Sequence, residues 1–461
     1  MNQLHEYKRM GQSVSRLALP VLVEQFFIVI MGVVNTMLAS NMGPEAISAI
    51  GMVDSISHIF ISVFGALAVG GTVVVAQYTG REDRKSANQA AGQALTSCLM
   101  ISGVVTAFIF ISQRLMLESL FDQAEAAVMQ NAHDYFSIVL WSYLPLAMTS
   151  VTFGILRGAG DTRTPMLVSI IMNVLNVIFS YSLIYGLYIN LGFWVIQTPA
   201  YGVSGAATGI TMARMAGMLL ILIPIFRGSK DIQLTSLHHF RLRKDMLKRV
   251  FQLGIPAGAE QLMFNGGKLV VQTFIVSLGT ASMAANAITG SVNSMIMIPG
   301  NALSIAATAL VGQLIGRGQP QEAKKQLKFL VVTASAAMLL LSLILFPMLR
   351  LIIGLYTSDT DTASLAFVVL VSSLIAQPLF WPGSFILPGG LRGAGDVTYT
   401  MVVSIISMWV IRIFLGYIFA LVLPLGVLGI WLAMYLDWLI RSVFFALRLK
   451  GRKWLQKSVI D

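Results

Sequence analysis

Cysteine is almost absent from this sequence, which contains only Cys98. One cysteine excludes an intramolecular disulfide and any multi-cysteine metal site, so we interpret Cys98 as a packing residue. Charged residues are also scarce, at 11% of the chain, against 56% hydrophobic residues and a mean hydropathy of +0.78. A single soluble core could not hide that much apolar surface, and the chain is therefore expected to lie in a lipid bilayer.

Long apolar stretches recur along the whole chain. Segments of about 20 residues with few charges are long enough to cross about 30 Å of hydrocarbon as helices. Twelve such helices are expected, over residues 15–39, 46–79, 88–112, 133–156, 165–188, 203–226, 250–276, 282–315, 327–348, 363–390, 398–422 and 427–447. The first stretch is too long for the core of a signal peptide, so it is expected to remain as a transmembrane helix.

The second half of the sequence repeats the first, displaced by 236 residues, as from Leu17 to Leu253. Further corresponding pairs are Pro20 and Pro256, Glu24 and Glu260, Gln77 and Gln313, and Gly80 and Gly316. Each half holds six expected helices, an even number, so both halves enter the membrane from the same side as parallel repeats. The sequence thus predicts an all-α membrane protein with an N-lobe over 1–227, a linker over 228–249 and a C-lobe over 250–461 that ends in a basic tail. A pseudo-two-fold axis along the membrane normal relates the lobes.

Lysine and arginine are distributed unevenly between the two expected faces of the membrane. With the residue 1 end inside, 26 of the 31 basic residues fall on the cytoplasmic side, including six from Arg441 to Lys457. This asymmetry predicts that both termini are cytoplasmic, in a cell membrane that we expect to be a bacterial inner membrane. The net charge of +11 is therefore interpreted as an orientation signal. Nucleic-acid binding is not expected, because no loop is long enough to form a folded basic face.

Two Gly-x-Gly-Asp sequences, which end at Asp161 and Asp396, match a motif of intramembrane aspartyl proteases. That chemistry needs two carboxylates converging on one water, whereas these two fall in corresponding turns of separate lobes. Helix capping explains the turns: a glycine ends one helix, Thr164 caps the next and Pro165 occupies its first turn. An enzyme is therefore rejected. No P-loop or metal-binding helix motif occurs, so no cofactor is expected.

Several duplicated motifs occur in a fixed order along the twelve helices. They are L-x-x-P at 17–20 and 253–256, V-A-Q-Y-x-G-R at 75–81, V-G-Q-L-x-G-R at 311–317, and L-R-G-A-G-D at 156–161 and 391–396. Together they resemble the multidrug and toxic compound extrusion (MATE) family. The resemblance implies a V-shaped pair of six-helix lobes that exports organic, often cationic, compounds by antiport with protons or sodium.

The sequence departs from that family at three positions. Many members carry an aspartate in the first helix where this chain has Asn35, which cannot titrate. One branch has a C-lobe cation site formed by a glutamate and an aspartate, at positions that look like Phe264 and Trp381 here. The resemblance therefore implies that both the helix 1 carboxylate and the C-lobe carboxylates are replaced.

Asp54 and His58 lie four residues apart, on one face of the second expected helix. Asp54 lies eight residues from Ala46, roughly 12 Å deep, and Asn35 can reach a similar depth. A carboxylate beside an imidazole in a low-dielectric lobe can take up a proton near neutral pH, so these three residues are the candidate ion-coupling site. The alternative is an inter-helix hydrogen-bond clasp.

A second set of polar residues forms a candidate substrate or cation pathway. Glu24 with Gln25, and Glu260 with Gln261, follow the helix-opening prolines of the two repeats. These acids can attract cationic substrate in an inward-facing vestibule, or bond backbone groups and neighbouring helices. The other members of the set are Lys268, Arg412, Phe264 and Trp381.

We therefore expect a monomeric secondary transporter that exports small organic molecules, coupled to protons or sodium. Two related alternatives are considered. A lipid-linked sugar flippase favours an arginine-rich cavity, for which only Arg214, Lys268 and Arg412 are available. A major-facilitator protein usually has a glycine, aspartate and basic run between helices 2 and 3, which residues 80–85 match poorly.

Overall fold

The computed structural model describes residues 2–122, 124–190 and 195–460. Its N-terminal half contains α1 (Asn2–Ser40), α2 (Pro44–Gly80), α3 (Arg84–Leu120), α4 (Ala126–Val139), η1 (Leu140–Ser142), α5 (Tyr143–Gly158), α6 (Arg163–Tyr185), β1 (Leu187–Asn190), β2 (Val195–Thr198) and α7 (Gly202–Arg227). After the linker, with η2 (Leu237–Phe240), the C-terminal half contains α8 (Lys244–Ser277), α9 (Thr280–Gly316), α10 (Pro320–Leu345), η3 (Phe346–Met348), α11 (Leu349–Tyr356), α12 (Thr360–Gly393), α13 (Val397–Ile406), π-helical η4 (Ser407–Ile413), α14 (Phe414–Tyr417), π-helical η5 (Ile418–Val422), α15 (Gly426–Lys450) and η6 (Lys453–Lys457).

These elements make six crossing segments in each half, because α4 continues into α5, α10 into α11, and α13 into η5. In the described part of the chain, eleven segments are long and apolar enough to cross a membrane by themselves. The twelfth is α8, whose polar residues include Glu260 and Lys268. The predicted all-helical membrane fold is confirmed, with a small addition: β1 and β2 pair as an antiparallel hairpin between α6 and α7.

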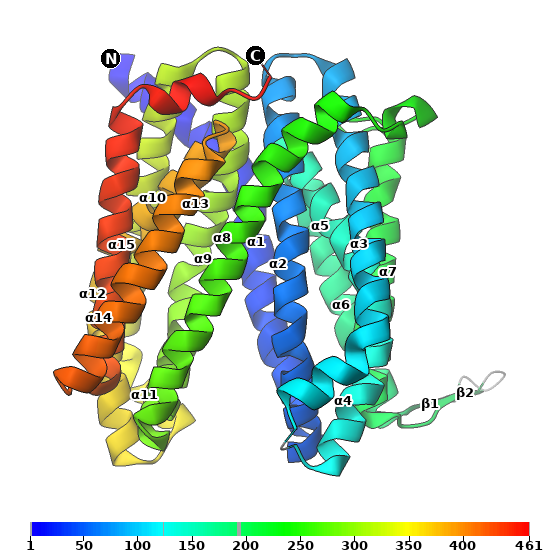
Figure 1. Ribbon diagram of the computed structural model, residues 1–461, viewed down its shortest axis with the longest axis vertical. Coiled ribbons are helices and arrows are strands. Elements are labelled where there is room, and N and C mark those ends of the chain that lie inside the picture. The colour runs from blue at the N-terminus through cyan, green and yellow to red at the C-terminus, as the bar shows by residue number, and fades with distance from the viewer. Residues whose placement is uncertain (1, 123, 191–194, 461) are drawn as a thin grey trace.

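The two lobes form a V (Figure 1). Both chain ends and the start of α8 lie at the end of the molecule where the lobes meet, and the lobes diverge toward the other end. The distribution of lysine and arginine predicts that this end faces the cytoplasm. Since α1 and α8 both start there, the two halves run in the same direction, as parallel repeats must.

The two lobes exchange the first halves of their first helices. Val14, Leu17 and Ala18 of α1 pack in the core of the C-lobe. In the same way, Val250, Leu253 and Ala257 of α8 pack in the core of the N-lobe. Each exchanged segment is buried against the opposite lobe, so the junction of the V is stabilised by apolar packing as well as by chain connectivity.

Reciprocal hydrogen bonds join the lobes at this junction. The side chain of Gln77 donates to the carbonyl of Gly393 at 3.0 Å, and that of Gln313 donates to the carbonyl of Gly158 at 2.8 Å. Each bond links a duplicated glutamine in one lobe to a duplicated turn in the other. The repeated motifs therefore meet one another across the pseudo-two-fold axis.

Glycines make this approach possible. A Cβ atom on Gly80 would overlap the backbone carbonyl of Gln313, and one on Gly316 would overlap that of Gln77. Backbone atoms cannot yield as a flexible side chain can, so α2 and α9 require glycine where they cross.

The basic tail crosses from the C-lobe to the N-lobe (Figure 1). The Val459 amide donates to Gln77 Oε1 at 3.0 Å, and its carbonyl accepts from Arg249 at 2.8 Å. Arg81 donates to the carbonyl of Ile460 at 3.3 Å. The tail thus adds a further connection across the closed end.

Candidate functional site

A cavity of about 420 Å³ lies inside the N-lobe, near the end where the lobes diverge. Its walls come from α1, α2, α4, α6 and α7, so five helices must pack correctly to form it. The polar residues that line it are Asn35, Thr36, Asp54, Ser57, His58, Tyr135, Asn176, Ser180 and Arg214. The other lining residues are mainly aliphatic, which lowers the local dielectric and strengthens the electrostatic interactions of those polar groups.

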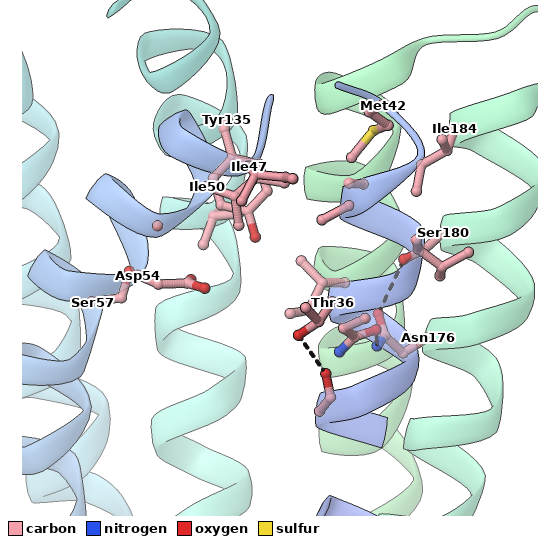
Figure 2. Close-up of a pocket in the computed structure, with 18 of the residues that line it drawn as sticks. Thr36, Met42, Ile47, Ile50, Asp54, Ser57, Tyr135, Asn176, Ser180 and Ile184 are labelled. Carbon is pink, nitrogen blue, oxygen red and sulfur yellow. Dashed lines mark hydrogen bonds between the residues drawn. The ribbon is translucent and has the colours of Figure 1, made fainter. Parts of the chain in front are cut away.

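Asp54 projects from α2 into this cavity, opposite the wall formed by α1 and α6 (Figure 2). Its side chain is exposed to the cavity. Within the described ranges, no hydrogen bond or salt bridge forms on its carboxylate, while Arg214 and His58 act on it as nearby charged groups. A carboxylate with free oxygens and an open approach can bind an ion or a cationic group directly.

The opposite wall carries neutral hydrogen-bonding groups. Asn176 on α6 donates to Asn35 Oδ1 on α1 at 3.0 Å and accepts from Ser180 at 3.2 Å. The Thr36 hydroxyl donates to the carbonyl of Gly32 at 2.9 Å, as Figure 2 shows. This wall holds amide and hydroxyl oxygens but no carboxylate, so Asp54 is the acidic residue among the lining residues.

Behind the cavity, two hydrogen bonds fix its polar residues. Arg214 donates to the Ser142 hydroxyl at 2.7 Å, and the Tyr143 hydroxyl donates to Ser57 at 2.6 Å. Ser142 and Tyr143 sit at the junction of η1 and α5. Two consecutive residues, the last of η1 and the first of α5, therefore anchor the α7 guanidinium and the α2 hydroxyl.

The structure brings together all three residues of the predicted ion-coupling site, since Asn35, Asp54 and His58 line one cavity. No hydrogen bond between Asp54 and His58 is formed in the described structure. Arg214, Asn176 and Tyr135 also line this cavity, and none of them was predicted as a member of the site. Arg214 carried a usable signal, because a cation within a transmembrane helix is a functional candidate by default. Asn176 and Tyr135 carried none.

The duplicated acids form two corresponding ion pairs. Glu24 on α1 accepts from Arg157 at 2.5 Å, and Glu260 on α8 lies 3.4 Å from Arg392. Both carboxylates are buried. Each arginine belongs to an L-R-G-A-G-D turn, so the two duplicated motifs are partners in space. The neighbouring amides differ: Gln25 is half-buried and Gln261 is exposed.

Removing one partner of a buried pair leaves an uncompensated charge, which typically costs about 3–5 kcal/mol. We therefore expect Arg157→Met to lower the apparent melting temperature of the detergent-purified protein strongly. The double variant Glu24→Gln with Arg157→Met should recover most of the loss, since neither charge remains. Arg163→Met is the matched control, because Arg163 is exposed and starts the next helix. Equal melting temperatures for Arg157→Met and Arg163→Met would contradict a stabilising pair.

The remaining predicted pathway residues lie in the C-lobe. Phe264 on α8 is half-buried, with the Lys268 ammonium 5.0 Å and the Arg412 guanidinium 5.3 Å from its ring centroid. Trp381 on α12 is buried and stacks on Phe385 with a centroid distance of 4.6 Å. These four residues do not line the N-lobe cavity.

Arg441, which the charge count above places among the six basic residues of the cytoplasmic side near the C-terminus, lies within a helix instead. It is 2% exposed and lies inside the C-lobe on α15, four residues after Asp437 and on the same helix face. Arg412 pairs with Asp437 at 2.5 Å. The signal was present, since residue 441 falls within the expected helix 427–447.

The two Gly-x-Gly-Asp turns have structural roles. Asp161 accepts from the backbone amides of Arg163 and Thr164, both at 3.1 Å, so Asp161 rather than Thr164 caps α6. Burial opposes its ionisation, but hydrogen bonds from Ser229 and Thr164 outweigh burial and lower the pKa of this carboxyl.

The corresponding Asp396 binds Arg448 at 2.6 Å instead. The two aspartates therefore have different partners in the two lobes, and each turn is explained without catalysis.

A sequence model of the MatE family matches residues 20–182 and 256–418. The two matches start at residues 20 and 256, a difference of 236, which is the displacement of the internal repeat. The chain belongs to the MatE family. With its long apolar helices in the described ranges, and relatives of this family that are named as transporters, the chain is a multi-pass membrane transporter.

Individual relatives match over nearly the whole chain. The uncharacterized transporter YisQ of Bacillus subtilis is 28% identical over 455 residues, 97% of this chain and 96% of that protein. The probable multidrug resistance protein NorM of Thermotoga maritima is 25% identical over 462 residues, 99% of this chain and 95% of that protein.

Solved structures share the fold. A MOP superfamily transporter from Pyrococcus furiosus, described as having a binding pocket of reversed polarity, superposes with a TM-score of 0.86 at 20% identity, over 97% of both chains. An outward-facing multidrug resistance MATE transporter superposes with a TM-score of 0.83 at 20% identity, also over 97% of both chains. These likenesses confirm the two-lobed architecture of MatE proteins for this chain.

Proposed function

We propose that this MatE protein is an antiporter that exports organic, cationic compounds in exchange for protons or sodium ions. The N-lobe cavity carries this proposal, because it exposes one carboxylate, that of Asp54, without a bonded partner in the described chain. Several relatives named as probable multidrug resistance proteins support the substrate class.

Competition for Asp54 is the proposed coupling step. A coupling ion neutralises the carboxylate, which removes its attraction for a cationic substrate and releases that substrate outward. When the ion leaves, the carboxylate regains its charge. Arg214 limits how strongly either cation binds, because its positive charge repels a second cation in the same cavity. Exchange of one monovalent ion for one monovalent cationic compound moves no net charge, so the concentration gradient of the ion drives export. A tenfold ion gradient supplies about 1.4 kcal/mol, which sustains a tenfold ratio of the exported compound.

The junction of the V is the proposed inner gate. The bonds of Gln77 and Gln313 join the lobes at the end of the molecule where the lobes meet. For inward opening, these reciprocal bonds must break and the lobes must separate. The ion gradient must also offset any apolar packing of the exchanged segments and any tail contacts that are lost when the lobes separate.

Orientation is part of the same proposal: both termini and the linker face the cytoplasm of a bacterial inner membrane. The variant Lys244→Cys, in a Cys98→Ser background, carries a single cysteine at residue 244. We expect this cysteine to react with a membrane-impermeant maleimide only after the cell membrane has been permeabilised. Tags at the two chain ends should be exposed by the same treatment. Labelling of residue 244 in intact cells would contradict this orientation.

A vesicle assay tests coupling. Purified protein in liposomes should accumulate ethidium against its gradient when a pH gradient or a sodium gradient is imposed, and the effective gradient identifies the ion. Ethidium movement that is unaffected by either gradient would reject antiport.

The same assay tests whether Glu24 and Glu260 attract cationic substrate in the vestibule. Unchanged ethidium transport by Glu24→Gln and Glu260→Gln would exclude that role.

A further inference from the structure

Three basic side chains surround one aromatic ring in the C-lobe. Lys268 Nζ lies 5.0 Å from the Phe264 ring centroid, and the guanidinium carbons of Arg412 and Arg441 lie 5.3 Å and 5.7 Å from it. The residues come from α8, η4 and α15, so three separate elements converge there. We name Lys268, Arg412 and Arg441 the C-lobe cationic cluster.

The carboxylates nearby do not balance this charge. Asp437 is bound by Arg412 at 2.5 Å, and it also accepts from the Ser407 hydroxyl. Glu260 is paired with Arg392 at 3.4 Å. Each of these two acids therefore already has an arginine partner, which leaves Lys268 and Arg441 as surplus positive charge.

Arg441 is incompletely bonded although its side chain is buried. It donates from Nη2 to the Ser404 hydroxyl at 3.0 Å. Its Nε and Nη1 atoms have no hydrogen-bond partner in the described structure, and neither does the Nε atom of Arg412. Buried guanidinium donors without acceptors are costly, and more so inside a membrane protein, unless an acceptor arrives from outside the chain.

Lys268 is the member of the C-lobe cationic cluster that a ligand can reach from outside the protein. Its side chain is exposed, and no hydrogen bond or salt bridge forms on its ammonium within the described ranges. The half-buried ring of Phe264 contacts both this exposed ammonium and the buried guanidinium of Arg441, with centroid distances of 5.0 Å and 5.7 Å. Rotation of the Phe264 side chain from one staggered χ1 rotamer to another would vacate the space that its ring now fills.

The surroundings of the cluster suit an organic anion more than a bare inorganic one. The Arg441 guanidinium lies 4.9 Å from the Phe385 ring and 5.9 Å from the Phe445 ring. Trp438 is packed edge-on against Phe385, with a centroid distance of 6.4 Å. An anionic group carried on an apolar or aromatic body would place its charge on the cluster and its body against these rings.

We propose that the C-lobe cationic cluster binds the carboxylate of an organic substrate, with Lys268 as the entry contact and Arg441 as the buried one. The inference rests on the proposed transport function and narrows its substrate class: a compound with a cationic group and a carboxylate satisfies Asp54 in one lobe and this cluster in the other. The two sites then hold opposite ends of a zwitterion, or alternate in binding it.

Equilibrium binding of 1-naphthoate to the full-length, detergent-purified protein tests the site, with neutral 1-naphthamide as the matched compound. We expect naphthoate to bind more tightly than naphthamide. Lys268→Gln should weaken naphthoate binding by about tenfold, the size expected for a lost hydrogen bond to a charged group, and leave naphthamide binding unchanged. Lys268→Arg should retain naphthoate binding.

Lys248→Gln is the matched control, because Lys248 is an exposed lysine on the same helix and outside the cluster. Equal naphthoate binding by Lys268→Gln and Lys248→Gln would overturn the site. So would equal binding of naphthoate and naphthamide by the unaltered protein. Since Lys268 is exposed, its replacement is compatible with folding, which the melting temperature checks.

Two further arms separate this inference from its alternatives. The first compares naphthoate binding in nanodiscs made of phosphatidylglycerol with binding in nanodiscs made of phosphatidylcholine. Loss of binding in phosphatidylglycerol alone would assign the cluster to a lipid phosphate and overturn the carboxylate proposal. Asp54→Asn should keep its naphthoate affinity in detergent. Gradient-driven ethidium efflux without any naphthoate binding would reject the anion site alone, and naphthoate binding without gradient-driven transport would reject the antiport proposal alone.

Discussion

We expect Asp54→Asn to reduce gradient-driven efflux by at least about 100-fold while the protein keeps its fold. The substitution preserves the shape of the side chain but removes the charge that the proposed coupling ion neutralises. Because Asp54 makes no hydrogen bond or salt bridge with another described residue, its replacement breaks no such bond in the described structure. Loss of one ion–carboxylate interaction of about 3 kcal/mol corresponds to roughly 100-fold in binding. The measurement is ethidium efflux from proteoliposomes under an imposed pH or sodium gradient.

Glu45→Gln is the matched control for this experiment. Glu45 is an exposed acid in the first turn of the same helix, α2, and it does not line the cavity. The control should transport at the unaltered rate and show the same melting temperature as Asp54→Asn. Normal efflux by Asp54→Asn would remove this carboxylate from the mechanism and leave the cavity as a binding site for neutral groups.

The second large effect is expected at the crossing of α2 and α9. Gly80→Val places atoms in the space occupied by the Gln313 carbonyl, and Gly316→Val does the same at Gln77. Such overpacking costs about 1–3 kcal/mol, and the bulk can be relieved only by separation of the lobes. We therefore expect either variant to shift the conformational equilibrium about tenfold or more away from the closed junction, and transport to fall in parallel.

Cysteine accessibility measures that shift. Ala159 is buried beside the junction, so a thiol at Ala159→Cys, in a Cys98→Ser background, reacts slowly while the junction is closed. Gly80→Val should accelerate its labelling from the cytoplasmic side about tenfold. Gly65→Val is the control, because a Cβ at Gly65 on the same helix meets nothing within 4 Å. An unchanged labelling rate in Gly80→Val would show that the close crossing does not set the gate.

The N-lobe cavity shows how much of a site can be predicted from a single sequence. Asp54 and His58 could be assigned to one face of one helix, because residues four apart are neighbours on any α-helix. Asn176 and Arg214 could not be added to them, since helical periodicity specifies which face of a helix is apolar but not which helix covers it. Five helices meet around the cavity, and that arrangement is a property of the whole lobe.

The ion pairs show the same limit. The duplication of Glu24 as Glu260 was evident from the sequence, and so was that of Arg157 as Arg392. Nothing in the linear pattern indicated that these two duplications pair with each other, because the partners are separated by 133 and 132 residues. Arg441 was misplaced for a related reason: its proximity to a basic tail in sequence concealed its burial beside Asp437 and Phe264.

The sequence by itself determined that the chain has twelve membrane-crossing segments in two parallel halves. Apolar length and internal repetition are local or additive properties, and the bilayer thickness converts them directly into helices. Only the tertiary structure decided which charges are neutralised, which remain unpaired, and where the two lobes touch. Those outcomes depend on side chains far apart in the chain, and the low dielectric between packed helices makes each pairing, or its absence, energetically large.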